Sequence, residues 1–326
     1  MIRFATKSDI ENLMNFIYYN WRKNHILSIN RSFFEYEHCD GEKVNFVISL
    51  DKDNNINGMQ GFIPYGKKHR DITKNLWRAL KCEIPHLGSK ILEFLIQNSD
   101  ARTVASIGSN PKTLSIYNRI GFHVGELSQW YRLCPINSYV IANICDSFIP
   151  RTKLKSKSWF ELKTMQDFIE NFDFDWYVKE KMIPFKEKWY IEKRYYNHPI
   201  YKYNIFGVRN DNNNMRLALV FRIEEYYGAK AIRLIDCIGD YNLLYYVTNE
   251  IDNFMRIQKA EYVDFYESGV NSNMMIDAGW LKVKGSDNII PNYFSPYEQR
   301  NVSIHYASSS STAVYFKGDG DQDRPN

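Results

Sequence analysis

A tyrosine near the end of a short expected helix is the first residue here whose type and position could do chemistry. The apolar run 103–107 reads as a strand, and Asn110-Pro111 behind it is typical of a helix N-cap and first turn. Gly121 marks the end of that helix, so Tyr117 lies one turn before the stop. A phenol held there can donate a proton to a leaving group. A core tyrosine packed beneath the helix end is the alternative.

A helix start that could bind phosphate is a second candidate. Gly88, Ser89 and Lys90 lead into an apolar helical pattern that begins at Ile91. Backbone N–H groups in the first turn of a helix have no partner within the helix, and they bind phosphate groups. One glycine before a helix is common, so it is the position ahead of the Tyr117 element that favours the phosphate interpretation.

Two side chains are candidates for a base. His25 lies in the polar loop 21–28 (WRKNHILS) after the first helix, and an unperturbed histidine has a pKa close to neutrality. A structural histidine bonded to the backbone is the alternative. Glu83 follows the strand candidate 76–82, where a carboxylate at a strand end could take a proton. An exposed loop acid is its alternative.

The C-terminal segment combines alternating acids with one base. Asp319, Asp321 and Asp323 alternate, but Arg324 stands where a calcium-binding loop needs glycine, so we expect no metal site. Two interpretations stay open. One is a frayed acidic terminus. The other is an edge that binds hydroxyl and amine groups, which the apolar run 314–316 favours because it would dock the segment.

The composition argues against several classes of protein. The 326 residues carry a formal net charge of +4, with short basic clusters at 67–70 and 151–157, which is too little and too dispersed to indicate nucleic-acid binding. The five cysteines form no CxxC pair, which argues against zinc and disulfide frameworks and indicates a reducing compartment. No apolar run approaches the length of a membrane span, and no signal peptide is visible. We expect a cytoplasmic protein.

Hydrophobic periodicity in the first half predicts alternating strands and helices around these candidates. A strand at 2–4 leads into a helix at about 9–20, opened by a capping box of Ser8 and Glu11. A hairpin, a strand, a helix, a strand, the Tyr117 helix and a last strand should follow, at 44–50 with 59–63, 76–82, 91–96, 103–107, 110–121 and 122 onward.

The second half repeats this order. A weakly patterned stretch with Pro135 and Pro150 predicts a linker at 136–157, between domains at 1–135 and 158–326. The second domain should contain two strands around a turn, a third strand, a helix, a fourth strand and a short helix ending at Gly279, at 205–209, 215–223, 231–238, 243–257, 262–266 and 271–278.

Three segments resemble the GNAT superfamily, the GCN5-related acetyltransferases. Residues 110–122 are similar to its second cofactor motif, residues 85–92 occupy the position of its pyrophosphate loop, and residues 2–10 resemble its first strand and capped helix. Two positions depart from the pattern. Glu83 stands where a basic or amide residue is usual, and His86 replaces the earlier glycine of the loop.

The resemblance covers roughly residues 1–132. It implies an α/β fold with two tandem GNAT-like domains, each a mixed, mostly antiparallel sheet flanked by helices. It also implies acyl-CoA as co-substrate and direct attack of an amine on the thioester. In this interpretation Tyr117 protonates the CoA thiolate, and His25 or Glu83 assists the amine unless the amine is already neutral. The residues it assigns to CoA are Gly88, Ser89, Lys90, Asn110 and Tyr117.

The second half is a degenerate version of the first. Met275 stands where Tyr117 stands in the first half, four residues before a glycine, and it cannot donate a proton. The loop 237–240 lacks the glycine series and adds Asp240 where a diphosphate would lie. We therefore expect one CoA site per chain, and a second half that contributes to the acceptor site.

A narrower resemblance concerns tandem-GNAT sugar N-acyltransferases, which modify nucleotide-linked amino-dideoxyhexoses such as dTDP-linked 3-amino-3,6-dideoxyhexoses for bacterial surface polysaccharides. It depends on residues 21–28, 85–88, 290–294 and 318–326. The acceptor residues it implies are Asn24, His25, Tyr293, Phe294, Asp319, Asp321, Asp323 and Arg324. The alternatives are a protein or small-molecule amine as acceptor, or a non-catalytic GNAT-shaped scaffold. A monomer and a homodimer are both compatible.

Overall fold

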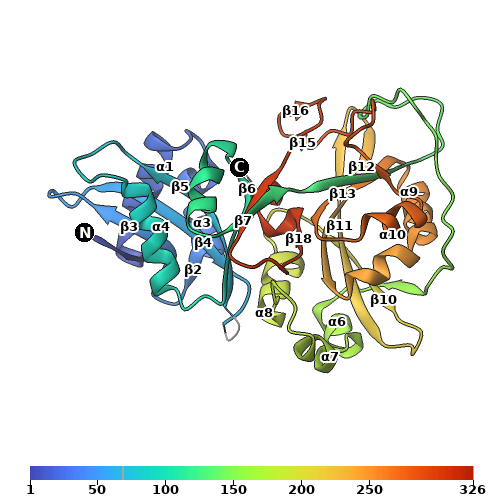
Figure 1. The fold of residues 1–326 in the computed structure, drawn as a ribbon, viewed down its shortest axis with the longest axis horizontal. Helices are drawn as coiled ribbons and strands as arrows, with labels where there is room; N and C mark the ends of the chain where they lie inside the picture. The colour runs from blue at the N-terminus through green and yellow to red at the C-terminus, as the bar shows by residue number, and fades with distance from the viewer. Residues whose placement is uncertain (68–69, 326) are drawn as a thin grey trace. The chain divides into compact units, whose positions relative to one another are not determined.

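The computed structural model describes residues 1–67 and 70–325, and the chain divides into two compact units. Residues 68 and 69 of the first basic cluster, and Asn326 of the tail, lie outside the described residues. The expected linker 136–157 lies inside the second unit. The first unit comprises Met1–Val124, Tyr306–Ser311 and Gly320–Asn326, and the second comprises Gly125–His305 and Thr312–Asp319 (Figure 1).

The first unit is built on a mixed sheet with the strand order β1-β3-β4-β5-β6-β17-β7 and with β2 paired to β3. Neighbours from β1 to β5 are antiparallel, whereas β5 and β6 run parallel. The strands are β1 (Ile2–Thr6), β2 (Cys39–Asp40), β3 (Lys43–Leu50), β4 (Ile56–Pro64), β5 (Asp71–Ala79), β6 (Thr103–Ser109), β7 (His123–Glu126) and β17 (His305–Ser308).

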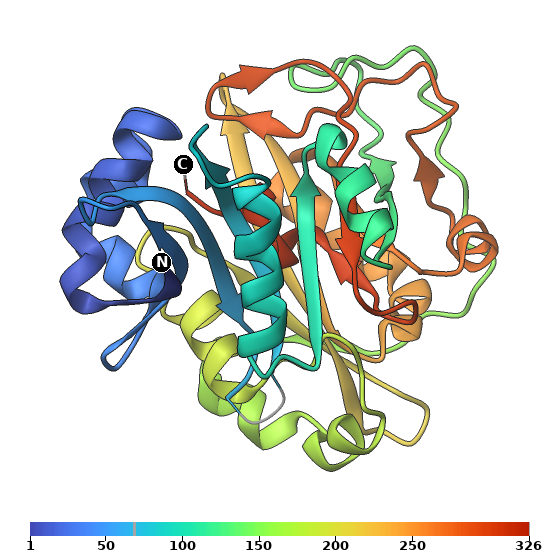
Figure 2. The same cartoon turned by 60° about the vertical axis from the view of Figure 1, so that its left-hand side comes forward.

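Helices cover both faces of this sheet (Figure 2). Successive strand residues point to opposite faces, so Phe46 packs with α1, α2 and α3 while Val47 packs with α4 and α5. The helices are α1 (Ile10–Asn20), α2 (Ile26–Ile29), α3 (Arg31–His38), α4 (Leu87–Asn98) and α5 (Leu114–Arg119), with 3-10 turns η1 (Lys7–Asp9), η2 (Pro111–Thr113) and η6 (Asp321–Asp323).

The capping box at the first helix is not the predicted one. Thr6 and Asp9 form it, because the chain makes the turn η1 before α1, and the Asp9 carboxylate accepts the Thr6 backbone N–H at 2.8 Å. Arg3 holds that carboxylate at 2.7 Å. The prediction of Ser8 and Glu11 was therefore wrong by two residues.

The second unit has a sheet of the same design, ordered β14-β8-β13-β12-β11-β10-β9, with β18 also paired to β13. The parallel pair is β12 and β13. Its strands are β8 (Ser128–Leu133), β9 (Trp159–Glu161), β10 (Asn204–Arg209), β11 (Met215–Tyr226), β12 (Ala229–Gly239), β13 (Ala260–Ser268), β14 (Leu281–Lys282) and β18 (Tyr315–Phe316), and a separate hairpin joins β15 (Tyr293–Phe294) and β16 (Tyr297–Glu298).

Helices also pack on both faces of this second sheet. Phe254 of α9 and Met275 of α10 pack with Leu217, Leu234 and other strand residues on one face. The helices before β10 pack on the other face. The helices and helical turns of the second unit are α6 (Met165–Asn171), α7 (Phe174–Lys179), α8 (Lys188–Ile191), the π-helical turn η3 (Glu192–Tyr196), η4 (Tyr241–Tyr246), α9 (Thr248–Gln258), α10 (Ser272–Asp277) and η5 (Lys317–Asp319).

In each sheet, one strand is distant in sequence from the strands that it pairs with. β8 follows β7 in sequence but joins the second sheet between β14 and β13, whereas β17 comes late in the chain and joins the first sheet between β6 and β7.

Among the described helices, none is both long and apolar enough to cross a membrane.

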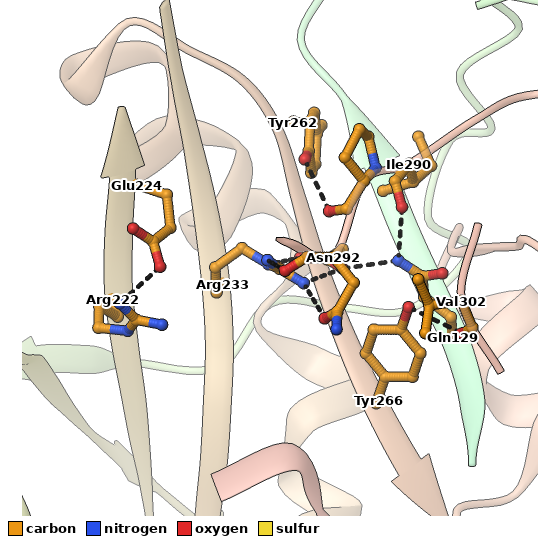
Figure 3. A network of polar contacts seen from close by, with 11 residues as sticks. Gln129, Arg222, Glu224, Arg233, Tyr262, Tyr266, Ile290, Asn292 and Val302 are labelled. Atoms are coloured by element: carbon orange, nitrogen blue, oxygen red, sulfur yellow. Dashed lines mark hydrogen bonds and ion pairs between the residues drawn. The ribbon is translucent and has the colours of Figure 1, made fainter. Parts of the chain in front are cut away.

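A buried polar network fixes a long connecting segment onto the second sheet. Arg233 on β12 is 1% exposed, and it pairs with Asp264 and donates to the Asn292 side chain at 3.0 Å. Gln129 on β8 donates to Asp264 at 2.8 Å and to the Ile290 carbonyl at 3.1 Å. Figure 3 shows these side chains converging from three strands and from the segment carrying Ile290 and Asn292. Because the partners satisfy one another, this network serves to hold the segment in place.

Candidate active site

β5 and β6 separate part-way along their length. They pair in parallel from Asp71↔Thr103 to Thr73↔Ala105, while β5 continues its antiparallel pairing with β4. Leu76, in a left-handed conformation at φ 43°, turns the β5 backbone beyond the last pair. In this opening, which we call the first splay, strand backbone N–H and C=O groups can pair with a ligand instead of with a neighbouring strand.

Tyr117 of α5 lies at the first splay and is 1% exposed. Lys74, the β5 residue after the last pair with β6, donates a hydrogen bond from Nζ to the Tyr117 hydroxyl. That Nζ lies 4.6 Å from the Tyr117 ring centroid and 4.4 Å from the Trp77 ring centroid. The side chains of Ser106 and Ser109 on β6 also hydrogen-bond Tyr117.

Burial changes the proton affinities of both groups. It raises the pKa of Tyr117 to about 12, and the hydrogen bonds from Ser106 and Ser109 oppose part of that rise. It lowers the pKa of Lys74 to about 7, and attraction to Asp321 opposes part of that fall. Tyr117 is therefore protonated near neutrality, whereas Lys74 gains or loses its proton there.

The C-terminal tail brings a carboxyl group to the same place. The Asn75 side chain hydrogen-bonds the carboxyl of Asp321 in η6. Gly320 lies so close to β6 that a Cβ atom there would be 2.5 Å from the Ile107 carbonyl oxygen. Burial raises the pKa of Asp321 to about 7, although the Asn75 bond and Lys74 oppose that rise. The tail thus places one carboxyl group beside Asn75 of β5, near the opening where Lys74 contacts Tyr117.

The start of α4 is open to a ligand. His86 occupies the N-cap in a left-handed conformation, and its side chain makes no capping hydrogen bond. Gly88 lies against the Trp77 ring, and its carbonyl accepts the indole N–H at 3.1 Å. Ser89 is partly exposed and Lys90 is exposed. The first-turn N–H groups therefore keep the anion-binding capacity of a helix start.

Two solved structures share this architecture. One is a conserved protein of unknown function from Enterococcus faecalis V583, described as a probable N-acyltransferase; it has a TM-score of 0.54 and 9% identity, covering 94% of this chain and 72% of that chain. The other is a GCN5-related N-acetyltransferase from Anabaena variabilis ATCC 29413, with a TM-score of 0.55, 10% identity and the same two coverages. The chain has the GNAT fold.

The two mixed sheets with flanking helices correspond to two GNAT-like domains, which confirms the fold class expected from the sequence. No family model matches the sequence, and no curated protein matches it. At 9% and 10% identity, the likeness to the GNAT structures concerns the fold. The activity of the site depends on the chemistry of its own residues.

Within this GNAT fold, the expected base candidates lie apart from the contacts of Tyr117. His25 is 7% exposed and caps α2, accepting the Leu27 backbone N–H on Nδ1 at 3.2 Å. Burial, together with Arg22, lowers the pKa of His25 to about 4, which leaves it a weak base. Glu83 is exposed and pairs with Lys52 at 3.5 Å.

The expected substrate and cofactor residues fall into several environments. Asn24 is exposed in a left-handed turn, and Asn110 accepts the Lys112 backbone N–H at 3.0 Å as a helix cap. Tyr293 and Phe294 form β15, where both are half-buried. Arginines lie over their rings, Arg300 over Tyr293 and Arg233 over Phe294.

The other tail residues make internal contacts. Asp319 is fully buried and pairs with Lys186 at 2.8 Å. Arg324 pairs with Glu37 of α3, and Asp323 is 1% exposed. Of the four tail residues expected at a substrate edge, Asp321 is therefore the one that lies at the first splay.

The second GNAT-like unit has a matching opening between β12 and β13, the second splay. These strands pair in parallel from Lys230↔Ala260 to Leu234↔Phe265. Beyond that point β18 pairs with the end of β13. In the second splay the chain thus supplies a paired strand, whereas in the first splay the tail residue Gly320 packs against Ile107 of β6.

A buried ionic cluster lies beside the second splay. Lys186 is 3% exposed, and its Nζ is 2.5 Å from Asp236 and 2.8 Å from Asp319. The Tyr195 hydroxyl donates to Asp236 at 2.6 Å. Burial alone would lower the pKa of Lys186, but the two carboxylates outweigh it and raise that pKa. Lys186 is thus permanently charged at physiological pH.

A cavity of about 320 Å³ opens within the second unit, which is at the small end of the range for ligand sites. The wall carries the aromatic rings of Trp176 and Tyr241 and the carboxylates of Glu180 and Asp240. Aromatic faces and carboxylates suit a hydroxylated ring, because the rings stack and the acids accept hydroxyl hydrogens.

Sequence reasoning missed Lys74 and the role of Asp321 at the first splay. The local sequence carries little signal for Lys74, because Thr73 and Asn75 flank it and make the centre of β5 look like an exposed polar stretch. A lysine is almost never fully buried unless it is paired. No local signal joins Lys74 to Asp321, because the two come from opposite ends of the chain.

Proposed function

We propose that this protein is a CoA-dependent N-acyltransferase whose acyl-CoA site lies in the first unit. The observation that carries the proposal is the first splay, with a buried, protonated Tyr117 at its apex. A GNAT fold alone hosts more than one function, so the proposal depends on this site and on the chemistry of its residues.

The open elements of the first unit suit the parts of CoA. The first turn of α4, with Gly88, Ser89 and Lys90, offers backbone N–H groups and one ammonium group to the diphosphate. The strand edges beyond the last β5–β6 pair offer backbone groups to the pantetheine amides. Asn110 shapes the turn that leads from β6 into the Tyr117 helix.

Tyr117 supplies a proton to the leaving group. When an amine nitrogen attacks the thioester carbonyl carbon, the C–S bond breaks and a thiolate departs. In this proposal the Tyr117 hydroxyl, which is protonated near neutrality, gives its proton to that sulfur as it leaves.

The acceptor in this proposal is a nucleotide-linked amino-dideoxy sugar used in bacterial surface polysaccharide synthesis. It is supported by the resemblance of residues 21–28, 290–294 and 318–326 to sugar N-acyltransferases. The second unit contributes to acceptor binding, and its cavity has the aromatic and acidic lining that a hydroxylated ring prefers. The transferred group is acetyl or a short hydroxyacyl group such as 3-hydroxybutyryl.

A thermal-shift screen tests this proposal, because a ligand that binds only the native state raises the melting temperature. The panel is acetyl-CoA, 3-hydroxybutyryl-CoA, CoA, dTDP, UDP and GDP, singly and in pairs. A shift with CoA species and a separate shift with one nucleotide support the sugar acceptor. A higher melting temperature with CoA species but with none of the nucleotides would indicate a protein or small-molecule amine as the acceptor. If no CoA species raises the melting temperature, the proposal of an enzyme is contradicted, and a non-catalytic binding scaffold remains.

A further inference from the structure

We propose that Arg324 of the C-terminal tail is an anion-binding residue, which holds a phosphate group of the acceptor through its Nε and Nη2 atoms. The identity of this ligand rests on the proposed function, because a nucleotide-linked sugar carries a diphosphate. The inference adds to that function a recognition site in the first unit and states which part of the acceptor it binds.

The guanidinium group of Arg324 is buried and only partly paired. The side chain is 7% exposed, and its Nη1 atom forms an ion pair with Glu37 of α3, which is equally buried. The Nε and Nη2 atoms are enclosed as well, and in the part of the chain that the structure describes neither has a hydrogen-bond partner. Enclosed donors of a charged group are costly to leave unpaired. Two of them side by side therefore indicate a ligand that accepts from both.

Two other buried arginines use this same edge of the guanidinium group to bind a carboxylate. Arg132 donates from Nε and Nη2 to the two carboxylate oxygens of Asp252, at 2.7 and 2.6 Å. Arg233 pairs the same two atoms with Asp264. The two parallel N–H groups match the spacing of the oxygens in a carboxylate or a phosphate. At Arg324 this edge is left for an anionic ligand.

Glu37 and the ligand would bind different parts of one cation. A guanidinium group has five N–H donors, so an ion pair at Nη1 leaves enough of them for a second anion. The Glu37 contact also fixes the orientation of the guanidinium plane. Because Nε and Nη2 are enclosed, a phosphate reaches them when the side chains that cover them move aside.

The first sheet separates this site from the position proposed for the CoA diphosphate. Glu37, the partner of Arg324, belongs to α3, which packs with Phe46 on one face of the sheet. The helix α4, whose first turn is proposed to bind the CoA diphosphate, packs with Val47 on the other face. We therefore assign the phosphate at Arg324 to the acceptor.

The tail joins Arg324 to the first splay. The Arg324 backbone N–H donates to the Asp321 carbonyl at 3.1 Å and closes the turn η6. The Asp321 side chain lies beside Asn75 of β5. Gln322 packs against β6, since a Cβ atom at Gly108 would be 3.0 Å from its Nε2 atom. An acceptor held by its phosphate at Arg324 is thus bound by the same short segment that borders the opening.

The test is a calorimetric titration of the full chain with dTDP and with CoA; UDP or GDP replaces dTDP if it is the nucleotide that raises the melting temperature. Arg324→Lys keeps a cation beside Glu37 but removes the paired donors. The double variant Glu37→Met with Arg324→Met removes both partners of the buried ion pair, so that neither charge is left alone. Arg31→Lys, at an exposed arginine of α3, is the matched control.

Arg324→Lys should weaken the binding of dTDP about tenfold, because a bidentate contact becomes a single one. The double variant should weaken it at least as much. The affinity for CoA should stay within twofold of wild type in both, because CoA places no phosphate at Arg324. Arg31→Lys should change neither affinity. The melting temperature of every variant shows whether it is folded.

Three results overturn the anion site. One is a folded Arg324→Lys variant whose dTDP affinity stays within threefold of wild type, or the same result with the double variant if Arg324→Lys does not fold. The second is a parallel loss of dTDP and CoA affinity, which a merely structural role would give. The third is a loss of CoA affinity alone, which would assign the phosphate to CoA. In each case turnover by wild type leaves the proposed function intact.

The wild-type titrations separate the two proposals. A wild type that binds CoA but none of the nucleotides overturns the anion site together with the nucleotide-linked acceptor, and leaves the acyl transfer. A wild type that binds dTDP through Arg324 but binds no CoA overturns the acyl transfer and leaves the anion site.

Discussion

The two splays have similar residues, but the pKa of the buried lysine is lowered at the first splay and raised beside the second. Each has a buried lysine at or beside the opening, and each has a carboxylate from the tail: Lys74 with Asp321 in the first unit, and Lys186 with Asp319 in the second. The second adds Asp236. That extra carboxylate raises the pKa of Lys186, whereas burial lowers the pKa of Lys74. Direct contact with two carboxylates raises the pKa of Lys186, whereas burial dominates at Lys74, whose Nζ donates to a neutral hydroxyl.

The helix ends beside the splays have matching backbones and different side chains. Phe122 donates to the Tyr117 carbonyl at 3.0 Å, and Trp280 donates to the Met275 carbonyl at 3.0 Å. Gly121 adopts φ 84° and Gly279 φ 87°. The same local geometry thus presents a phenol in one unit and a thioether in the other.

The loops ahead of α4 and α9 differ in burial. Between β5 and α4 the chain is mostly exposed, and the α4 start carries no side-chain cap. Between β12 and α9 the turn η4 buries Leu243, Leu244 and Tyr245. Gly239 of that connection lies where a Cβ would be 2.1 Å from the Arg216 carbonyl oxygen, so the backbone is closely packed there. These differences suit a ligand in the first unit and an internal structural role in the second.

The largest expected effect concerns the ionic cluster of the second unit. Lys186→Met leaves Asp236 and Asp319 buried without their cation, and we expect the free energy of unfolding to fall by about 3–5 kcal/mol. Urea unfolding followed by circular dichroism measures this change. Lys202→Met, at an exposed lysine of the same unit, is the control. Equal stabilities for the two variants would mean that the cluster is not a structural tie.

Replacing the phenol of the first unit should give the next largest effect. Tyr117→Phe removes the proton donor and should lower kcat about 100-fold, with acyl-CoA affinity within twofold of wild type. Thiol release and a CoA titration measure the two quantities. Met275→Leu, at the matching helix end of the second unit, should leave kcat unchanged. Full turnover by Tyr117→Phe would exclude Tyr117 as the acid.

The two helix-ending glycines should give a smaller, graded effect. Gly121→Ala places a side chain in the left-handed region with no atom within 4 Å, so we expect about 1–2 kcal/mol lower stability. Gly279→Ala adds contacts at 2.9 Å to Arg132 and at 3.0 Å to the Pro150 carbonyl oxygen. It should therefore destabilise by about 1 kcal/mol more. Thermal unfolding of both variants tests the order, and a reversed order would contradict it.

Sequence periodicity located the elements around Tyr117, because their signals are local. The Asn110-Pro111 start and the Gly121 stop fix a short helix without help from distant residues. It placed β5 too late, at 76–82 instead of Asp71–Ala79, because Lys74 and Asn75 interrupt the apolar pattern. Their partners lie far away in the sequence, because Lys74 contacts Tyr117 and Asn75 hydrogen-bonds Asp321 of the tail.

Strand pairing between distant parts of the chain could not be predicted from the sequence. The apolar alternation around 128–133 and 305–308 does not say which sheet each strand joins, and the structure sends β8 to the second sheet and β17 to the first. The position of Asp321 beside Asn75 of β5 is of the same kind, since it depends on where the tail docks. His25 looked like a base because its type titrates near neutrality, whereas burial lowers its pKa to about 4.

The number of CoA molecules bound per chain tests the central comparison most directly. The measurement is a calorimetric titration of the full chain with CoA, repeated with Lys90→Ala at the start of α4. We predict one CoA per chain, with affinity lowered about tenfold by Lys90→Ala, because one phosphate-facing charge is lost. Two CoA molecules per chain, or one whose affinity is unaffected by Lys90→Ala, would contradict the assignment of the cofactor to the first unit.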